Sequence, residues 1–342
     1  MSIFGGTTEH FGIDIGTNAL RVVQLSGGGK KYSLKSFAFA PLPPGTTQSD
    51  SRLDYQKISR MIQDLTKQAG ISTKNVVAAI PGTSTFNTIV KIPPMSQAEL
   101  EKAIKYQAEQ NIPLKIEEVK YDYQIIKEDG ATKELTVMII AATKAKVEQL
   151  LDILENAGLN VIALETSTVA MARSLAKPEV PLAMILDIGS TTTEIAVIEN
   201  GILVQTRSFP LAGFGMTRSI SQQLGLDMSQ AEQFKQRFGL SQDKLEGQVF
   251  KAIEPILRNI LDEAIRSTKF YEEQFGKSVQ RIILTGGVSR MPLIAEFIKS
   301  YTGMEVMFGN PWTNVSYASN LNDSIMSVAP EFATSVGLAM RG

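Results

Sequence analysis

Cysteine is absent from this chain of 342 residues, and histidine occurs only at position 10. Without cysteine the chain can form no disulfide, no thiolate nucleophile and no cysteine-ligated zinc or iron–sulfur cluster. His10 lies in the leader before the first predicted strand, so a histidine-ligated metal site and a Ser–His–Asp triad are excluded too.

The sequence also lacks an excess of charge and any long apolar run. Its 34 basic and 35 acidic side chains give a net charge of −1, which creates no global field toward nucleic acid or anionic lipid. Apolar runs such as Val137–Ala142 are far shorter than the ~20 residues that span a bilayer. The first ten residues lack the basic and apolar regions of a secretory signal. We expect a cytoplasmic protein that binds no nucleic acid and reaches a membrane only through a partner.

One motif occurs twice. Residues 11–25 read FGIDIGTNALRVVQL, and residues 184–198 read MILDIGSTTTEIAVI. The matching pairs are Asp14 with Asp187, Gly16 with Gly189, and Thr17 with Ser190. Each copy predicts two strands joined by a tight turn, whose backbone N–H groups and hydroxyls can bind phosphate beside a carboxylate that holds a hydrated cation. Two copies predict duplicated lobes that hold one polyphosphate from opposite sides.

The two turns supply most of the candidate site. The candidate phosphate-binding residues are Asp14, Gly16, Thr17, Asn18 and Arg21 in the first copy, and Asp187, Gly189, Ser190, Thr191 and Thr192 in the second. We expect Asp14 and Asp187 to hold Mg²⁺ through water. The alternative is a pair of structural turns that cap strand ends. No P-loop signature occurs, so the site is not of that type.

A glycine pair, Gly286-Gly287, lies between a predicted buried strand, 281–285, and a helix that we expect Ser289 to cap. Such a pair lets a flat base or ribose lie against the backbone at a helix N-terminus. An ordinary strand–helix loop is the alternative.

Between the two motif copies, residues 84–156 have a pattern of their own. We predict a strand at 86–92, a helix at 96–111, strands at 119–126 and 135–142, and a helix at 144–156, which suits a small inserted α+β module. Farther along, a long amphipathic helix is predicted over 244–275, with Pro255 expected to kink or divide it.

Together these residues resemble the superfamily of actin, sugar kinases and heat-shock ATPases. The two Asp turns look like its phosphate motifs, and residues 284–290 (LTGGVSR), which include Ser289 and Arg290, look like its adenosine motif. The resemblance also implies nucleotide contacts at Gly213, at Glu232 and Lys235 on one helix, and a carboxylate near the attacking water at Glu165. Small residues at Ala170 and Gly337 fit its connecting helices. Taken alone, Glu232 and Lys235 would more often be a solvated ion pair than nucleotide contacts.

The insert indicates the branch of the superfamily. Its segments IPPM (92–95), AEQNIP (108–113) and YDYQ (121–124) closely resemble the PilM family, which shares the 1C subdomain with FtsA. The implied fold is α/β and actin-like, with duplicated ribonuclease H-like lobes and an FtsA-type 1C insert. The implied division is 1–83 plus 157–183 (1A), 84–156 (1C), 184–215 plus 277–342 (2A), and 216–276 (2B).

The resemblance implies an ATP- and Mg²⁺-binding scaffold of type IV pilus assembly, or of the related type II secretion or competence machinery. It would bind the cytoplasmic N-terminal tail of a PilN-type inner-membrane protein beside the insert. The resemblance is also compatible with self-association of the protein. Asn18, Arg21 and Ala212 depart from the commoner family pattern, which leaves hydrolysis open.

Two alternatives stay open. A small-molecule kinase of the same fold would use Asp187 as its base. A filament protein like FtsA would carry an amphipathic helix after the last lobe helix, and this sequence stops at Gly342 without one.

Overall fold

The computed structural model describes residues 9–29, 31–43, 45–49 and 51–341. The first eight residues, considered above for a secretory signal, lie outside this range. The chain divides into two compact units. The first unit holds residues 1–173, 312–319 and 334–342, and the second holds 174–311 and 320–333.

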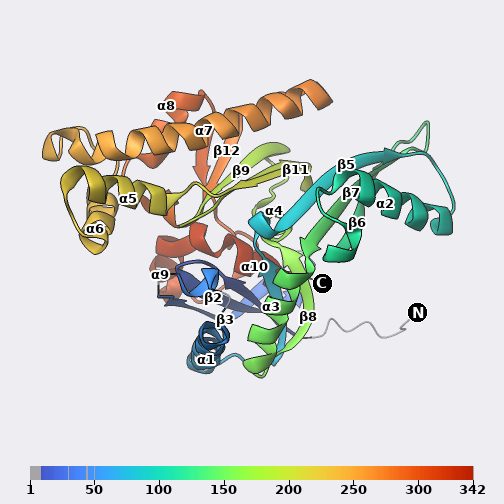
Figure 1. The fold of residues 1–342 in the computed structure, drawn as a ribbon, viewed down its shortest axis with the longest axis horizontal. Helices are drawn as coiled ribbons and strands as arrows, with labels where there is room; N and C mark the ends of the chain where they lie inside the picture. Colours follow the sequence, from blue (N-terminus) through green and yellow to red (C-terminus); the bar gives the residue numbers. More distant parts are fainter. Residues whose placement is uncertain (1–8, 30, 44, 50, 342) are drawn as a thin grey trace. The chain divides into compact units, whose positions relative to one another are not determined.

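The first unit is built on a mixed sheet with the strand order β14-β3-β2-β1-β4-β8. Figure 1 labels β2, β3 and β8 of this sheet. The strands are β1 (Phe11–Ile15), β2 (Ala19–Gly28), β3 (Lys31–Pro41), β4 (Asn75–Ile80), β8 (Asn160–Thr166) and β14 (Val315–Ser316). Strands β1, β2 and β3 form an antiparallel meander, whereas β4 runs parallel to β1, and β8 parallel to β4.

The sheet of the second unit has the order β11-β10-β9-β12-β13. Its strands are β9 (Leu182–Ile188), β10 (Thr193–Glu199), β11 (Ile202–Phe209), β12 (Arg281–Thr285) and β13 (Glu305–Phe308). Here too the first three strands along the chain are antiparallel, and the last two run parallel to the first. The order and directions repeat β3-β2-β1-β4-β8, so the predicted duplication is confirmed.

Helix α1 (Arg52–Gln68) covers the first sheet because its apolar positions recur at helical spacing. Ile58, Ile62 and Leu65 are buried in one core with β1 and β2. The helix is followed by Gly70, whose φ of +66° suits glycine.

The insert forms a separate antiparallel sheet, β5-β7-β6, with α2 beside it (Figure 1). Its elements are β5 (Thr85–Ile92), α2 (Gln97–Asn111), β6 (Val119–Glu128) and β7 (Leu135–Thr143). Ser96 and Glu99 make a capping box at the start of α2, and Leu100 and Ile104 are buried against β7. The next helix, α3 (Lys144–Asn156), packs instead on α1, with Ile153 in the core of the first sheet. The four-part division stays a prediction.

The second unit carries the longest helix of the described chain and four shorter ones. They are α5 (Gly213–Leu224), α6 (Met228–Phe238), α7 (Gln248–Phe275), α8 (Ile294–Thr302) and α9 (Asn322–Val328). Of the two outcomes predicted at Pro255, division of the long helix is wrong, because α7 is continuous through it, and a kink stays a prediction. Pro255 is exposed, while Ile253 and Leu257 on the opposite face are buried in one core, so burial offsets the lost backbone hydrogen bond.

Helices α4 (Ser167–Leu175) and α10 (Ala333–Ala339) contain two of the four places where the chain passes between the units. Within the first unit they cross closely, since a Cβ built on Gly337 would lie 1.9 Å from the carbonyl oxygen of Ala170. Short 3₁₀ turns lie at Thr46–Gln48, Gly82–Ser84, Ile116–Glu118, Leu245–Gly247, Gly287–Arg290, Ser319–Leu321 and Ala329–Phe332. Among the helices of the described chain, none combines the length and apolarity needed to cross a membrane.

Candidate functional site

The first predicted turn joins β1 to β2 and is fixed by backbone hydrogen bonds at Gly16 and Asn18. The Gly16 N–H donates to the Ala19 carbonyl at 3.1 Å, and the Asn18 carbonyl accepts from the Leu42 N–H at 2.8 Å. A Cβ on Gly16 would lie 3.0 Å from the Ala19 oxygen, so glycine suits this turn. Thr17 and Asn18 lie at its tip, and Asn18 is exposed. The turn is therefore fixed while its tip faces solvent.

Asp14 and Arg21 are direct partners across this hairpin. The Arg21 Nη1 lies 3.8 Å from the Asp14 Oδ2, and both side chains are largely buried. Burial raises the pKa of Asp14, although the Arg21 guanidinium acts to lower it. A poorly solvated carboxylate of this kind would be stabilised by a cation placed beside it.

The second turn, between β9 and β10, repeats this geometry. The Gly189 N–H donates to the Thr192 carbonyl at 3.0 Å, as Gly16 does to Ala19. Asp187 is held by the Thr285 hydroxyl, which donates to its Oδ1 at 2.8 Å. Ser190 and Thr191 lie at the tip of the turn.

Glu194 is a site residue that sequence reasoning missed. It is buried and pairs directly with Asp187 across β9 and β10. In the first hairpin the corresponding partner of Asp14 is Arg21. The two copies of the motif could have revealed it, because Arg21 in residues 11–25 occupies the same position as Glu194 in residues 184–198. The two hairpins therefore share a backbone but carry opposite charge at this position.

Helix α5 begins against the second turn. The Gly213 N–H donates to the Gly189 carbonyl at 3.1 Å, and the Phe214 N–H donates to the Ser190 carbonyl at 2.6 Å. A Cβ on Gly213 would lie 2.8 Å from the Val288 Cγ2. The absence of a side chain at Gly213 therefore lets the turn, the start of α5 and the glycine-pair loop pack closely at this point.

Glu232 and Lys235 lie on α6 and form an ion pair of 2.7 Å. The Lys235 Nζ also donates to the Thr217 Oγ1 at 2.8 Å and to the Gly213 carbonyl at 3.1 Å. Burial lowers the pKa of Lys235, although Glu232 acts to raise it. Burial acts to raise the pKa of Glu232, but Lys235 and hydrogen bonds outweigh it and leave that pKa lowered. The pair is therefore part of the structure around Gly213.

The glycine pair follows β12. Gly286 has a φ of +82°, and a Cβ there would lie 2.4 Å from the Ile188 carbonyl oxygen. Gly287 is exposed, with open space where a Cβ would be. The prediction that Ser289 caps a helix is wrong, because a 3₁₀ turn follows, and α8 begins only at residue 294. The Ser289 hydroxyl donates instead to the Gly286 carbonyl at 2.6 Å.

The second unit thus brings together most of the residues nominated in it. Those linked by the contacts above are Asp187, Gly189, Ser190, Thr192, Gly213, Glu232, Lys235, Gly286 and Ser289. Arg290 lies at the end of the 3₁₀ turn, and its guanidinium pairs with Glu331 at 3.1 Å. In the first unit Asp14, Gly16, Thr17, Asn18 and Arg21 belong to one hairpin.

Glu165 lies on the same face of the first sheet as Asp14. Ile13 pairs with Ala78, which pairs with Leu164 on the next strand. Asp14 and Glu165 are the following residues on parallel strands, so their side chains point to one side, about 10 Å apart across two strand spacings.

Both oxygens of the Glu165 carboxylate accept guanidinium N–H groups. Arg173 donates to each oxygen at 2.8 Å, and Arg341 lies 2.7 Å from Oε1. Arg173 also donates to the Gly337 carbonyl at 2.7 Å. Glu165 therefore links β8, α4 and the end of α10, and its role beside an attacking water stays a prediction.

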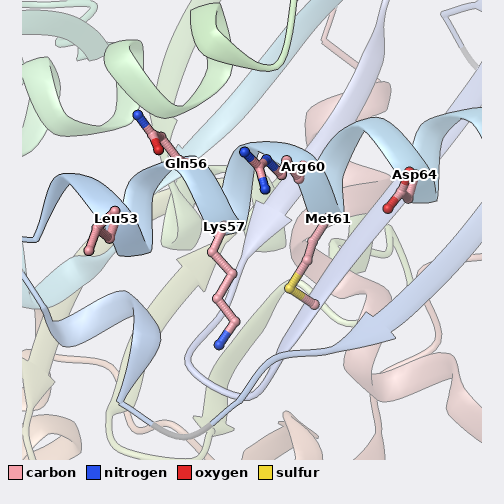
Figure 2. Close-up of a pocket in the computed structure, with 6 residues that line it drawn as sticks. All are labelled: Leu53, Gln56, Lys57, Arg60, Met61 and Asp64. Carbon is pink, nitrogen blue, oxygen red and sulfur yellow. The ribbon is translucent and has the colours of Figure 1, made fainter.

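A pocket of about 300 Å³ lies along α1, away from these residues in the sequence. Its lining, drawn in Figure 2, is Leu53, Gln56, Lys57, Arg60, Met61 and Asp64. All six come from a single helix, and none belongs to the candidate site.

Comparisons with known proteins agree with this geometry. FtsA of Neisseria meningitidis serogroup B is 26% identical over 325 residues, which cover 83% of this chain and 77% of FtsA. A solved structure named "PilM-PilN type IV pilus biogenesis complex" is similar with a TM-score of 0.84 and 28% identity, over 98% of this chain and 99% of its own. MreB5 of Spiroplasma citri bound to AMPPNP has a TM-score of 0.56 and 13% identity, over 97% and 95% of the two chains.

The predicted actin-like fold is therefore confirmed. A family model described as "Type IV pilus assembly protein PilM" matches residues 12–342. Because this match spans nearly the whole sequence, the chain belongs to the PilM family of type IV pilus assembly proteins.

Proposed function

We propose that this chain is a nucleotide-binding scaffold of type IV pilus assembly that binds the cytoplasmic N-terminal tail of a PilN-type inner-membrane protein. The observation that carries the proposal is the likeness to the PilM-PilN complex over nearly the full length of both chains. In this proposal the protein is cytoplasmic and lies at the inner membrane through its partner.

The nucleotide would be ATP, held by the two Asp turns and the glycine-pair loop. The fold is shared with MreB5, whose structure contains AMPPNP. In this chain the fit is supported by the fixed turns at Gly16 and Gly189 and by the open space beside Gly287, where a base could lie on the backbone.

Mg²⁺ would be held at Asp14 and Asp187. Across the described ranges of the chain there is no cluster of three acidic or histidine side chains that could hold a metal ion by themselves. A divalent cation would therefore take phosphate oxygens and water for its remaining ligands, as Mg²⁺ commonly does.

A matched pair of glycine substitutions tests the nucleotide site. Gly287 and Gly130 both have open space around a built Cβ, so alanine at either position should leave stability unchanged. We expect Gly287→Ala to weaken binding of a fluorescent ATP analogue by about tenfold, or about 1.4 kcal/mol. Gly130→Ala, in the insert, should bind like the wild type. Equal affinities in all three proteins would contradict a base lying against Gly287.

The partner is tested by titrating a PilN-type N-terminal peptide, with and without Mg·ATP, against a scrambled peptide. We expect saturable binding of the native peptide. If nucleotide affects it, Asp14→Ala and Asp187→Ala should remove that dependence. Absence of peptide binding under both conditions would overturn the scaffold function even if ATP binds.

The proposed arrangement keeps the four-part division, with the peptide beside the insert of residues 84–156. In this arrangement the tail docks on an element that supplies none of the residues of the candidate nucleotide site. Removing residues 86–141 leaves α3 in the core of the first sheet and joins Thr85 to Ala142, which are paired on adjacent strands. This deletion should therefore remove peptide binding and leave nucleotide binding, which the same two titrations would measure.

A further inference from the structure

The ammonium group of Lys235 is the feature of the candidate site that the proposed function leaves unexplained. The residue is only 6% exposed although it carries a charge. A buried ammonium is stable only where its hydrogens are bonded. Its surroundings therefore determine what it can bind.

An ammonium carries three N–H donors and no acceptor. The Lys235 Nζ has three acceptors within the protein: the Glu232 Oε2 at 2.7 Å, the Thr217 Oγ1 at 2.8 Å and the Gly213 carbonyl at 3.1 Å. All three donors are thus used inside the second unit. A nucleotide could gain a hydrogen bond from Lys235 only if one of these were broken.

Two of the three acceptors belong to the first turns of α5. Gly213 in turn donates its N–H to the Gly189 carbonyl, and the Phe214 N–H donates to the Ser190 carbonyl. A short path of hydrogen bonds therefore runs from α6, through Lys235 and Gly213, to the turn that would hold phosphate.

Glu232 differs from Lys235 in its exposure. Its side chain is 40% exposed, and its Oε1 accepts only from the Gln236 amide among the bonds identified. Glu232 can therefore still accept from a ribose hydroxyl, whereas Lys235 is turned away into the protein.

We propose that Lys235 is a positioning residue for the phosphate end of the nucleotide, acting through Gly213 on the turn at Gly189 and Ser190, and not a ligand of ribose or base. The inference rests on the proposed nucleotide site. The family resemblance implies a nucleotide contact for both Glu232 and Lys235. In this proposal only Glu232 contacts the nucleoside, whereas Lys235 fixes the turn at Gly189 and Ser190.

The test measures the two halves of the nucleotide separately. Adenosine and Mg·tripolyphosphate would each displace a fluorescent ATP analogue from wild type, Lys235→Met and Lys251→Met. Lys251 is an exposed lysine of the same unit and serves as the control. We expect Lys235→Met to lose about tenfold in tripolyphosphate affinity, the size of one charge-assisted hydrogen bond, and to keep its adenosine affinity.

Loss of adenosine affinity with tripolyphosphate affinity retained would overturn the proposal, because Lys235 would then be a nucleoside ligand. Equal loss of both would also overturn it, because a general loosening of the site would explain the result. If Lys235→Met does not fold, Thr217→Val removes one of the three acceptors and should give the same split with a smaller loss. Failure of the wild type to bind the ATP analogue would instead overturn the proposed nucleotide function itself.

Discussion

Replacing Gly337 with alanine tests the crossing of α4 and α10. A Cβ at this position would lie 1.9 Å from the Ala170 carbonyl oxygen and 2.4 Å from its carbon. Carbon and oxygen normally approach no closer than about 3.3 Å, so the two helices would have to separate by more than about 1 Å. The separation would also stretch the hydrogen bond from Arg173 to the Gly337 carbonyl, now 2.7 Å.

Two opposing terms set the size of the effect. Alanine is favoured over glycine in a helix interior by about 1 kcal/mol. Overpacking of a tight contact typically costs about 1–3 kcal/mol, occasionally more. Here the clash is with the backbone of Ala170 and cannot be relieved by a side-chain rotation, so the cost should exceed the gain. Taking the upper end of the cost, about 3 kcal/mol, less the gain of about 1 kcal/mol, we expect a net loss of about 2 kcal/mol, measured by urea unfolding.

Gly215→Ala is the matched control. Gly215 also lies in a helix, α5, but a Cβ there would meet Leu211 at 3.6 Å and Ile256 at 3.7 Å, which are ordinary contacts. This variant should be as stable as the wild type or more stable, by up to about 1 kcal/mol. The reasoning is refuted if Gly337→Ala unfolds at the same urea concentration as Gly215→Ala.

Three further variants extend these tests. Burial raises the pKa of Asp14 above its ordinary value of 3.8, so the ionised carboxylate lowers the free energy of unfolding at neutral pH. Urea unfolding should therefore show Asp14→Asn to be more stable than the wild type at pH 7. This gain should shrink as the pH falls toward 3.8. Glu165→Gln leaves Arg173 and Arg341 without their carboxylate and should lower the free energy of unfolding by about 1–3 kcal/mol, with a smaller loss in high salt. Unchanged stability together with slower ATP hydrolysis would indicate that Glu165 is a catalytic base instead. Ser96→Ala removes half of a capping box and should destabilise α2 by about 1 kcal/mol, seen as faster hydrogen exchange over residues 97–111 in the variant.

Local patterns in the sequence were sufficient to predict the hairpins and the insert. The turns after Asp14 and Asp187 were predicted because a short motif with glycine after alternating apolar residues specifies a tight connection by itself. The helix after Ser96 was predicted because its capping box involves residues only three apart. The duplication followed from the repeat of such local signals, whereas the actin-like fold was implied by the resemblance of these motifs to a known superfamily.

Tertiary structure decided the features that depend on residues far apart in the chain. Pro255 stays within one helix because buried neighbours hold both halves of α7 on the same core. Glu165 meets Arg341 only when the C-terminal residues return to β8. The sequence pattern implied the same nucleotide-binding role for Lys235 and Glu232. Packing of α6 against α5 distinguishes them, because it buries the Lys235 ammonium and leaves the Glu232 carboxylate partly exposed to solvent. Such burial is a property of the folded chain, and no local pattern encodes it.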